Sequence, residues 1–167
     1  MKTMYFLLLA LIFSPINIYS QSHILKSPDQ SSEFKITVGE KIEYEVWYNG
    51  TRILGNSVFG LQFSQAPYFG QNLSVIHHEN KTVNDTWEPV VGSFQKVLNH
   101  YNELTIDVQE DKYPERRVKI AIRVYNDGIA FRYQIPDSWN RFLPNYQDVD
   151  RLMLLDEMTS FRFSSNH

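Results

Sequence analysis

The sequence predicts an all-β domain of antiparallel strands, and three observations support this prediction. Beyond residue 20, apolar and polar residues alternate with the period of two that marks half-buried strands. No long window shows the 3.6-residue period of an amphipathic helix. The pairs Asn49-Gly50 and Asp127-Gly128 stand between alternating segments, where hairpin turns are expected.

The first twenty residues have the pattern of a secretory signal peptide. Lys2 is the only charged residue before Lys26, and ten apolar or aromatic residues run from Met4 to Phe13. Ten residues are too few to cross a bilayer as a helix but suit a signal-peptide core. We therefore expect a signal peptide at 1–20 and an exported domain at 21–167, periplasmic or secreted, with no membrane attachment after cleavage.

Composition excludes several classes of function. The 167 residues carry 16 Lys+Arg against 19 Asp+Glu, and this formal net charge of −3 provides no basic field for nucleic acid. Cysteine is absent, which excludes disulfides, thiolate metal sites and a cysteine nucleophile. The length suits one domain of ordinary size.

Alternation places the strands of the first half in order. We expect them at residues 33–38, 41–48, 52–54, 58–63 and 73–77. Asn49-Gly50 joins the second to the third, because both residues tolerate a positive φ. Residues 67–71 form a loop. The alternation weakens over residues 82–92, around Trp87, which we interpret as an extended arm or edge.

The second half predicts a three-stranded meander whose register follows from side-chain parity. If Asp127-Gly128 is a two-residue loop, Val124 lies opposite Phe131, and both apolar faces coincide. If Val108 lies opposite Val118, the outer face gains two opposite-charge pairs. The predicted structural polar row consists of Glu103, Arg123 and Arg132, in which Arg132 lies opposite Arg123, together with Asp107 and Lys119.

No common catalytic constellation is convincing in this sequence. Glycoside hydrolysis needs two carboxylates around a sugar, but the predicted partners neutralise Glu103 and Asp107. Glu88 beside Trp87 could contact a sugar, although capping a turn is the favoured interpretation. Trp47 could offer a stacking platform, although packing is favoured. The two histidines His77 and His78 fall on opposite strand faces, so no metal site is expected.

Several segments together resemble one known family. They are LKSPD at 25–29, YEVWYNGTRIL at 44–54, DTWEPVVG at 85–92, NHYNEL at 99–104, YNDGIAFRY at 125–133 and EMTSFRF at 157–163. In this order they resemble the N-terminal domain of glycoside hydrolase family 97. The resemblance covers residues 24–163.

That resemblance implies a fold and a role. The family contains exported bacterial α-glucosidases and α-galactosidases, with an N-terminal antiparallel β-super-sandwich of galactose mutarotase-like fold and a catalytic (β/α)8 barrel. Its catalytic carboxylates lie in the barrel, and its calcium ligands lie there or late in the N-terminal domain. The resemblance therefore implies an incomplete sandwich at residues 21–167 that carries no catalytic residue, metal ligand or cofactor and packs on the barrel.

A stand-alone module that binds α-linked glycans is the alternative. It would need several exposed aromatic side chains, drawn from Trp47, Trp87, Trp139 and Tyr146. The candidates for contacting a sugar or the barrel are Trp47, Trp87, Glu88 and Tyr101.

Overall fold

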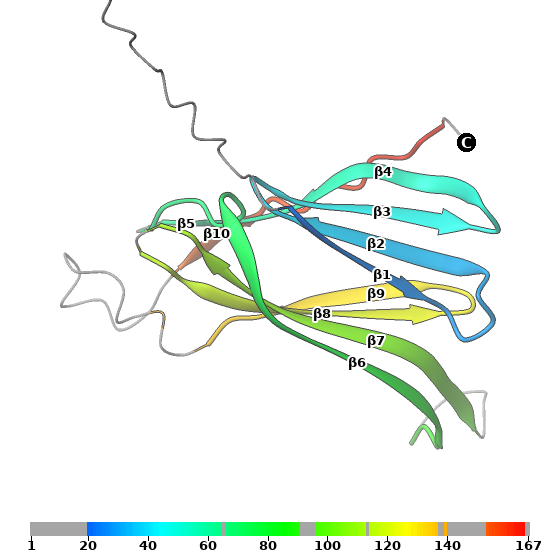
Figure 1. Cartoon of the computed structure of the whole chain (residues 1–167). Helices are drawn as coiled ribbons and strands as arrows, with labels where there is room; N and C mark the ends of the chain where they lie inside the picture. The colour runs from blue at the N-terminus through cyan, green and yellow to red at the C-terminus, as the bar shows by residue number, and fades with distance from the viewer. Residues whose placement is uncertain are drawn as a thin grey trace, which may run out of the picture.

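The computed structural model describes residues 20–64, 66–90, 96–112, 114–136, 139 and 153–165. Apart from Ser20, the predicted signal peptide lies outside the described residues. The described chain forms two four-stranded antiparallel sheets, ordered β1-β2-β3-β4 and β6-β7-β8-β9, and a short pair β10-β5 (Figure 1). The strands are β1 (Gln21–Lys26), β2 (Ser32–Val38), β3 (Ile42–Tyr48), β4 (Thr51–Phe59), β5 (Leu61–Phe63), β6 (Leu73–Trp87), β7 (Val97–Glu110), β8 (Arg117–Tyr125), β9 (Ile129–Gln134) and β10 (Leu154–Glu157).

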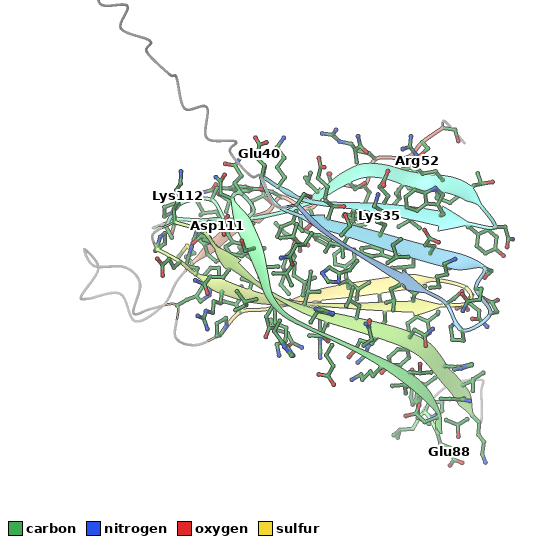
Figure 2. The ribbon with its side chains drawn as sticks, viewed as in Figure 1. Lys35, Glu40, Arg52, Glu88, Asp111 and Lys112 are labelled. Carbon is green, nitrogen blue, oxygen red and sulfur yellow. The ribbon has the colours of Figure 1, made fainter. Side chains whose placement is uncertain are left out.

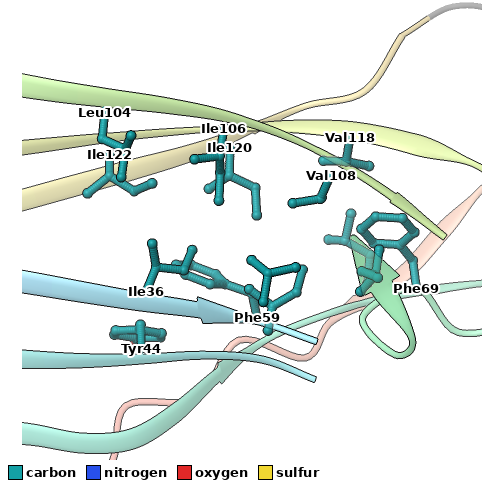
Figure 3. Close-up of a cluster of buried hydrophobic side chains, with 14 of the residues drawn as sticks. Ile36, Tyr44, Phe59, Phe69, Leu104, Ile106, Val108, Val118, Ile120 and Ile122 are labelled. Carbon is teal, nitrogen blue, oxygen red and sulfur yellow. The ribbon is translucent and has the colours of Figure 1, made fainter. Parts of the chain in front are cut away.

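The two larger sheets face each other and enclose one hydrophobic core, so the predicted all-β fold is confirmed. The inward side chains of β2, β3 and β4 meet those of β7 and β8 in Figure 3. Alternation explains which residues point inward, because successive side chains of a strand point to opposite faces. The labelled members of this layer are Ile36, Tyr44, Phe59, Leu104, Ile106, Val108, Val118, Ile120 and Ile122.

The hairpin predicted at Asn49-Gly50 is present. Tyr48 pairs with Thr51, and the two turn residues have φ of 48° and 78°, the left-handed values that a tight two-residue turn requires. The return strand is longer than predicted, since β4 continues without a break to Phe59. Alternation alone missed this continuity because Gly55 and Asn56 interrupt the apolar pattern.

Gly60, between β4 and β5, lies so close to the Tyr68 side chain that a larger residue would not fit there. A Cβ built on Gly60 would lie well inside the van der Waals radius of the Tyr68 hydroxyl. Gly70 adopts φ of 140°, which a side chain would strain. The two glycines therefore let the loop around Phe69 fold back onto β5, where the Leu61 and Phe69 backbones exchange two hydrogen bonds of 2.9 Å.

The register predicted between β7 and β8 is the one observed. Glu103 lies opposite Arg123, and Asp107 lies opposite Lys119. The Glu103 side chain points to the outer face, although it is only 5% exposed. Its Oε2 accepts a hydrogen bond from Arg123 Nε at 2.5 Å, and its Oε1 lies 2.7 Å from Lys81 Nζ.

The register predicted between β8 and β9 is wrong by two residues. Val124 pairs with Ile129, so Arg123 lies opposite Ala130, and Arg132 lies opposite Ala121. Arg132 is therefore diagonal to Arg123 on the outer face. The second cation that pairs with Glu103 is Lys81 of β6.

The turn geometry gives the reason for this shift. Neither Asp127 nor Gly128 has a positive φ, so they do not form the primed two-residue turn that the prediction assumed. The turn closes instead with Tyr125 N–H donating to Gly128 C=O at 2.8 Å. The Asn126 side chain also accepts a hydrogen bond from Asp29 N–H at 3.2 Å, which ties the turn to the β1–β2 loop.

Candidate interaction surface

The β6–β7 hairpin forms an arm that extends beyond the rest of the second sheet (Figure 1). Strand β7 pairs with β6 as far as Val97, whereas its pairing with β8 stops at Tyr101. At the end of the arm, β6 and β7 therefore pair only with each other. Both faces are accessible there, and Trp87 and Leu98 are 54% and 64% exposed. This surface is available for contact with another molecule or domain.

Three of the four candidate contact residues lie on this arm. Trp87 ends β6, and Glu88 follows it at the far end of the arm (Figure 2). Glu88 Oε1 lies 3.8 Å from Lys96 Nζ, and both side chains are largely exposed, so this ion pair contributes little to stability. Tyr101 lies on β7, where the arm joins the sheet.

Tyr101 is engaged within the domain. Its side chain is 4% exposed, its ring centroid lies 5.0 Å from that of Tyr125, and the Arg123 guanidinium lies 4.5 Å above its ring. Arg123 also binds Glu103, so these contacts adjoin the polar row. Tyr101 therefore packs against the sheet at the point where the arm begins, and a cation–π contact with Arg123 holds its ring.

Trp47 is separated from the other candidates. It lies on β3 of the first sheet, with Glu33 and Arg52 as its cross-strand neighbours. Figure 2 shows Arg52 and Lys35 on that sheet, at the top of the view, and Glu88 at the end of the arm, at the bottom. Of the other aromatic residues considered for glycan binding, Trp139 is 2% exposed, and Tyr146 lies outside the described residues. The described members of this candidate set therefore form no single stacking platform, and Trp47 instead lines a groove with Phe161 and Phe163.

A second accessible surface lies where the two sheets separate. A groove of about 530 Å³ opens between β3–β4 and β9, and its walls include Tyr44, Ile129, Phe131, Phe161 and Phe163. The segment 158–164 runs beside β4 and β5, with Met158, Ser160 and Ser164 N–H groups donating to Gly60, Val58 and Ile53 carbonyls. Phe161 and Phe163 are 57% and 66% exposed. This side of the core is thus incompletely covered by the described residues.

The electrostatics of Glu103 do not suit acid–base catalysis. Burial raises the pKa of Glu103, but hydrogen bonds and charges from Lys81 and Arg123 outweigh burial and hold the pKa below its usual range. A glycosidase acid requires the opposite, a raised pKa. Glu103 is therefore a fixed carboxylate that holds β6, β7 and β8 in register.

We expect the described residues to hold no metal, since the resemblance implies calcium ligands in the barrel or late in the N-terminal domain. Nowhere in the described parts of the chain do three or more histidine, aspartate or glutamate side chains come together to hold a metal. The same parts of the chain contain no helix long and apolar enough to cross a membrane.

Sequence reasoning missed Lys81 as a partner of Glu103. The pairing of β6 with β7 shifts between Val75 and His77, and beyond that bulge Lys81 lies opposite Glu103. A strand predicted to stop at His77 contains no residue that reaches Glu103. Residues 79–85 are polar except for Val83, so apolar alternation gives no signal that would have extended the strand.

Fold and surface together define an antiparallel β-sandwich module with two accessible apolar surfaces. The chain belongs to glycoside hydrolase family 97, since the model of that family's N-terminal domain matches residues 25–167. It is 29% identical over 134 residues to a retaining α-galactosidase from Bacteroides thetaiotaomicron. This alignment covers 80% of this chain and 19% of that protein.

Solved structures agree with this assignment of the fold. A family 97 enzyme from Pseudoalteromonas sp. strain K8 in complex with panose superposes with a TM-score of 0.73 at 19% identity. The alignment covers 85% of this chain and 20% of that one. A β-arabinopyranosidase gives a TM-score of 0.72 at 23% identity over 86% of this chain and 21% of its own. This chain therefore spans about a fifth of the length of these relatives.

Proposed function

We propose that this domain is a non-catalytic structural module of an exported family 97 α-glycosidase, an α-glucosidase or α-galactosidase, and that it packs on a catalytic (β/α)8 barrel. The match of residues 25–167 to the family's N-terminal domain carries this proposal. The chain aligns with only about a fifth of each relative, which supports the proposal, because the other four fifths of those proteins can contain the catalytic domain. The hydrophobic N-terminal segment supports export.

Two sets of exposed apolar side chains support a packing role for this domain. One is the arm, with Trp87, Val90 and Leu98, and the other is the segment from Met153 to Phe163. Contiguous exposed apolar surface on a soluble domain marks an interaction site. In this proposal the arm contacts the barrel and helps to wall the mouth of its active site, while the calcium of the whole enzyme binds outside the described residues.

The alternative is a module that binds α-linked glycans by itself. The exposed Trp87 favours it, because an accessible indole face can stack on a sugar ring. The engaged ring of Tyr101 and the remote position of Trp47 count against it, because neither can extend a platform around Trp87.

Sequencing the DNA that follows the codon for His167, in all three frames, tests the packing role. We expect sequence that encodes a (β/α)8 barrel in one of the frames, because the packing surfaces need that partner. A stop codon followed by unrelated genes would contradict the proposal and favour the glycan-binding module.

A further inference from the structure

Two histidines from different sheets meet at one rim of the sandwich. His23 lies on β1, the first strand of one sheet, and His78 lies on β6, the first strand of the other. Their ring centroids are 4.6 Å apart, and the ring planes are inclined by 54°. The contact therefore links strands that share no backbone hydrogen-bonded ladder.

The chemistry of His23 suits a metal ligand. Its Nε2 is buried and has no hydrogen-bond partner among the described residues. Burial, and in second place the neighbouring His78, lowers the pKa of His23, which favours the neutral form of the ring. The neutral imidazole is the form that binds transition metals.

The cross-strand partners and the same-face neighbours of the two histidines carry no charge. In the ladders, His23 lies opposite Ile36, and His78 lies opposite Ile106. The next residues along the same strand faces are Gln21, Leu25 and Asn80, all uncharged. Glu79 and His77 are on the opposite face of β6, as alternation requires.

We propose that His23 and His78 form a binding site for a divalent transition-metal ion such as Zn²⁺, with water completing the coordination. Imidazole nitrogens bind Zn²⁺ at about 2.1 Å, and two rings that share one ion at a right-angled to tetrahedral angle have centroids about 4.5–5.2 Å apart. The observed 4.6 Å falls in this range. The bound ion connects the two sheets at the β1–β6 rim. This inference is independent of the proposed function.

Calorimetric titration of the folded chain with ZnCl2 tests the site directly. We expect one equivalent to bind, and at least a tenfold loss of affinity in His23→Gln and in His78→Gln. His77→Gln is the matched control, because it removes the neighbouring imidazole from the other face of β6. His78 is exposed, so His78→Gln is expected to fold normally even if the change at His23 disturbs packing.

Thermal unfolding provides a second readout. Zn²⁺ is expected to raise the Tm of the unchanged chain and of His77→Gln by about 3–6 °C for each tenfold increase above the dissociation constant. MgCl2 is expected to have no such effect, because Mg²⁺ prefers oxygen ligands. Absence of saturable binding, or equal binding by His78→Gln and the unchanged chain, would overturn the proposal. A loss confined to His77→Gln would also overturn it.

Discussion

Replacing Arg116 with methionine is expected to lower the free energy of unfolding by about 3–5 kcal/mol, because it leaves a buried carboxylate without its partner. Arg116 is 1% exposed and Glu110 is 8% exposed. Arg116 Nε and Nη2 donate to the two Glu110 carboxylate oxygens at 2.9 and 2.5 Å. The guanidinium also lies over the rings of Phe69 and Trp139, at 5.5 and 5.1 Å from their centroids. One side chain thus joins the β7–β8 hairpin to two loops.

Urea unfolding followed by circular dichroism measures this effect. Arg117→Met is the matched control, because the neighbouring Arg117 side chain is exposed and, among the described residues, donates only to Gln109. We expect a change within about 0.5 kcal/mol. Adding Glu110→Gln to Arg116→Met removes the stranded charge and is expected to recover part of the loss. Equal stability of Arg116→Met and Arg117→Met would show that the buried pair does not hold these loops.

Replacing Phe59 with alanine is expected to cost about 3–5 kcal/mol of unfolding free energy, the usual cost of a large cavity in a core. Phe59 is fully buried, and its ring contacts both sheets. Its centroid lies 4.6 Å from that of Tyr44 in the first sheet and 4.8 Å from that of Phe131 in the second. The cavity would therefore open directly between the sheets, beside the groove that β9 borders.

The comparison for this variant is Phe163→Ala, which removes the same ring from a position that is 66% exposed. We expect its unfolding midpoint in urea to remain close to that of the unchanged chain. Phe59→Leu is expected to lose less than Phe59→Ala, because leucine refills part of the space. If Phe59→Ala and Phe163→Ala had the same midpoint, the ring at residue 59 would not be the link between the sheets.

Much of the fold could be predicted because alternation determines which side chains are buried. The register of β7 and β8 follows from parity, since a slip of one residue would put Ile106 and Ile120 on opposite faces of the sheet. The Asn49-Gly50 hairpin follows from the backbone freedom of two residues. In each case a local rule and the burial of one face select the same arrangement.

The remaining features depend on contacts between distant segments. The β8–β9 turn is held partly by Asp29 N–H, 97 residues away from Asn126, and no local turn rule contains that contact. The partner of Glu103 depends on the bulge in β6. Among the candidate contact residues, the sequence could identify Trp87 but could not show that Arg123 and Tyr125 engage the ring of Tyr101.

Titration calorimetry of the mature chain with α-linked glucosides and galactosides, combined with an assay for released sugar, tests most directly whether this domain has a structural role. The structural role predicts no heat beyond dilution and no released sugar, because Lys81 and Arg123 hold the candidate carboxylate Glu103 and because Trp47 and Trp87, the candidate sugar contacts, lie on different sheets. A saturable heat of binding that disappears in Trp87→Ala would contradict this account and establish a glycan-binding module. Released sugar would contradict it as well.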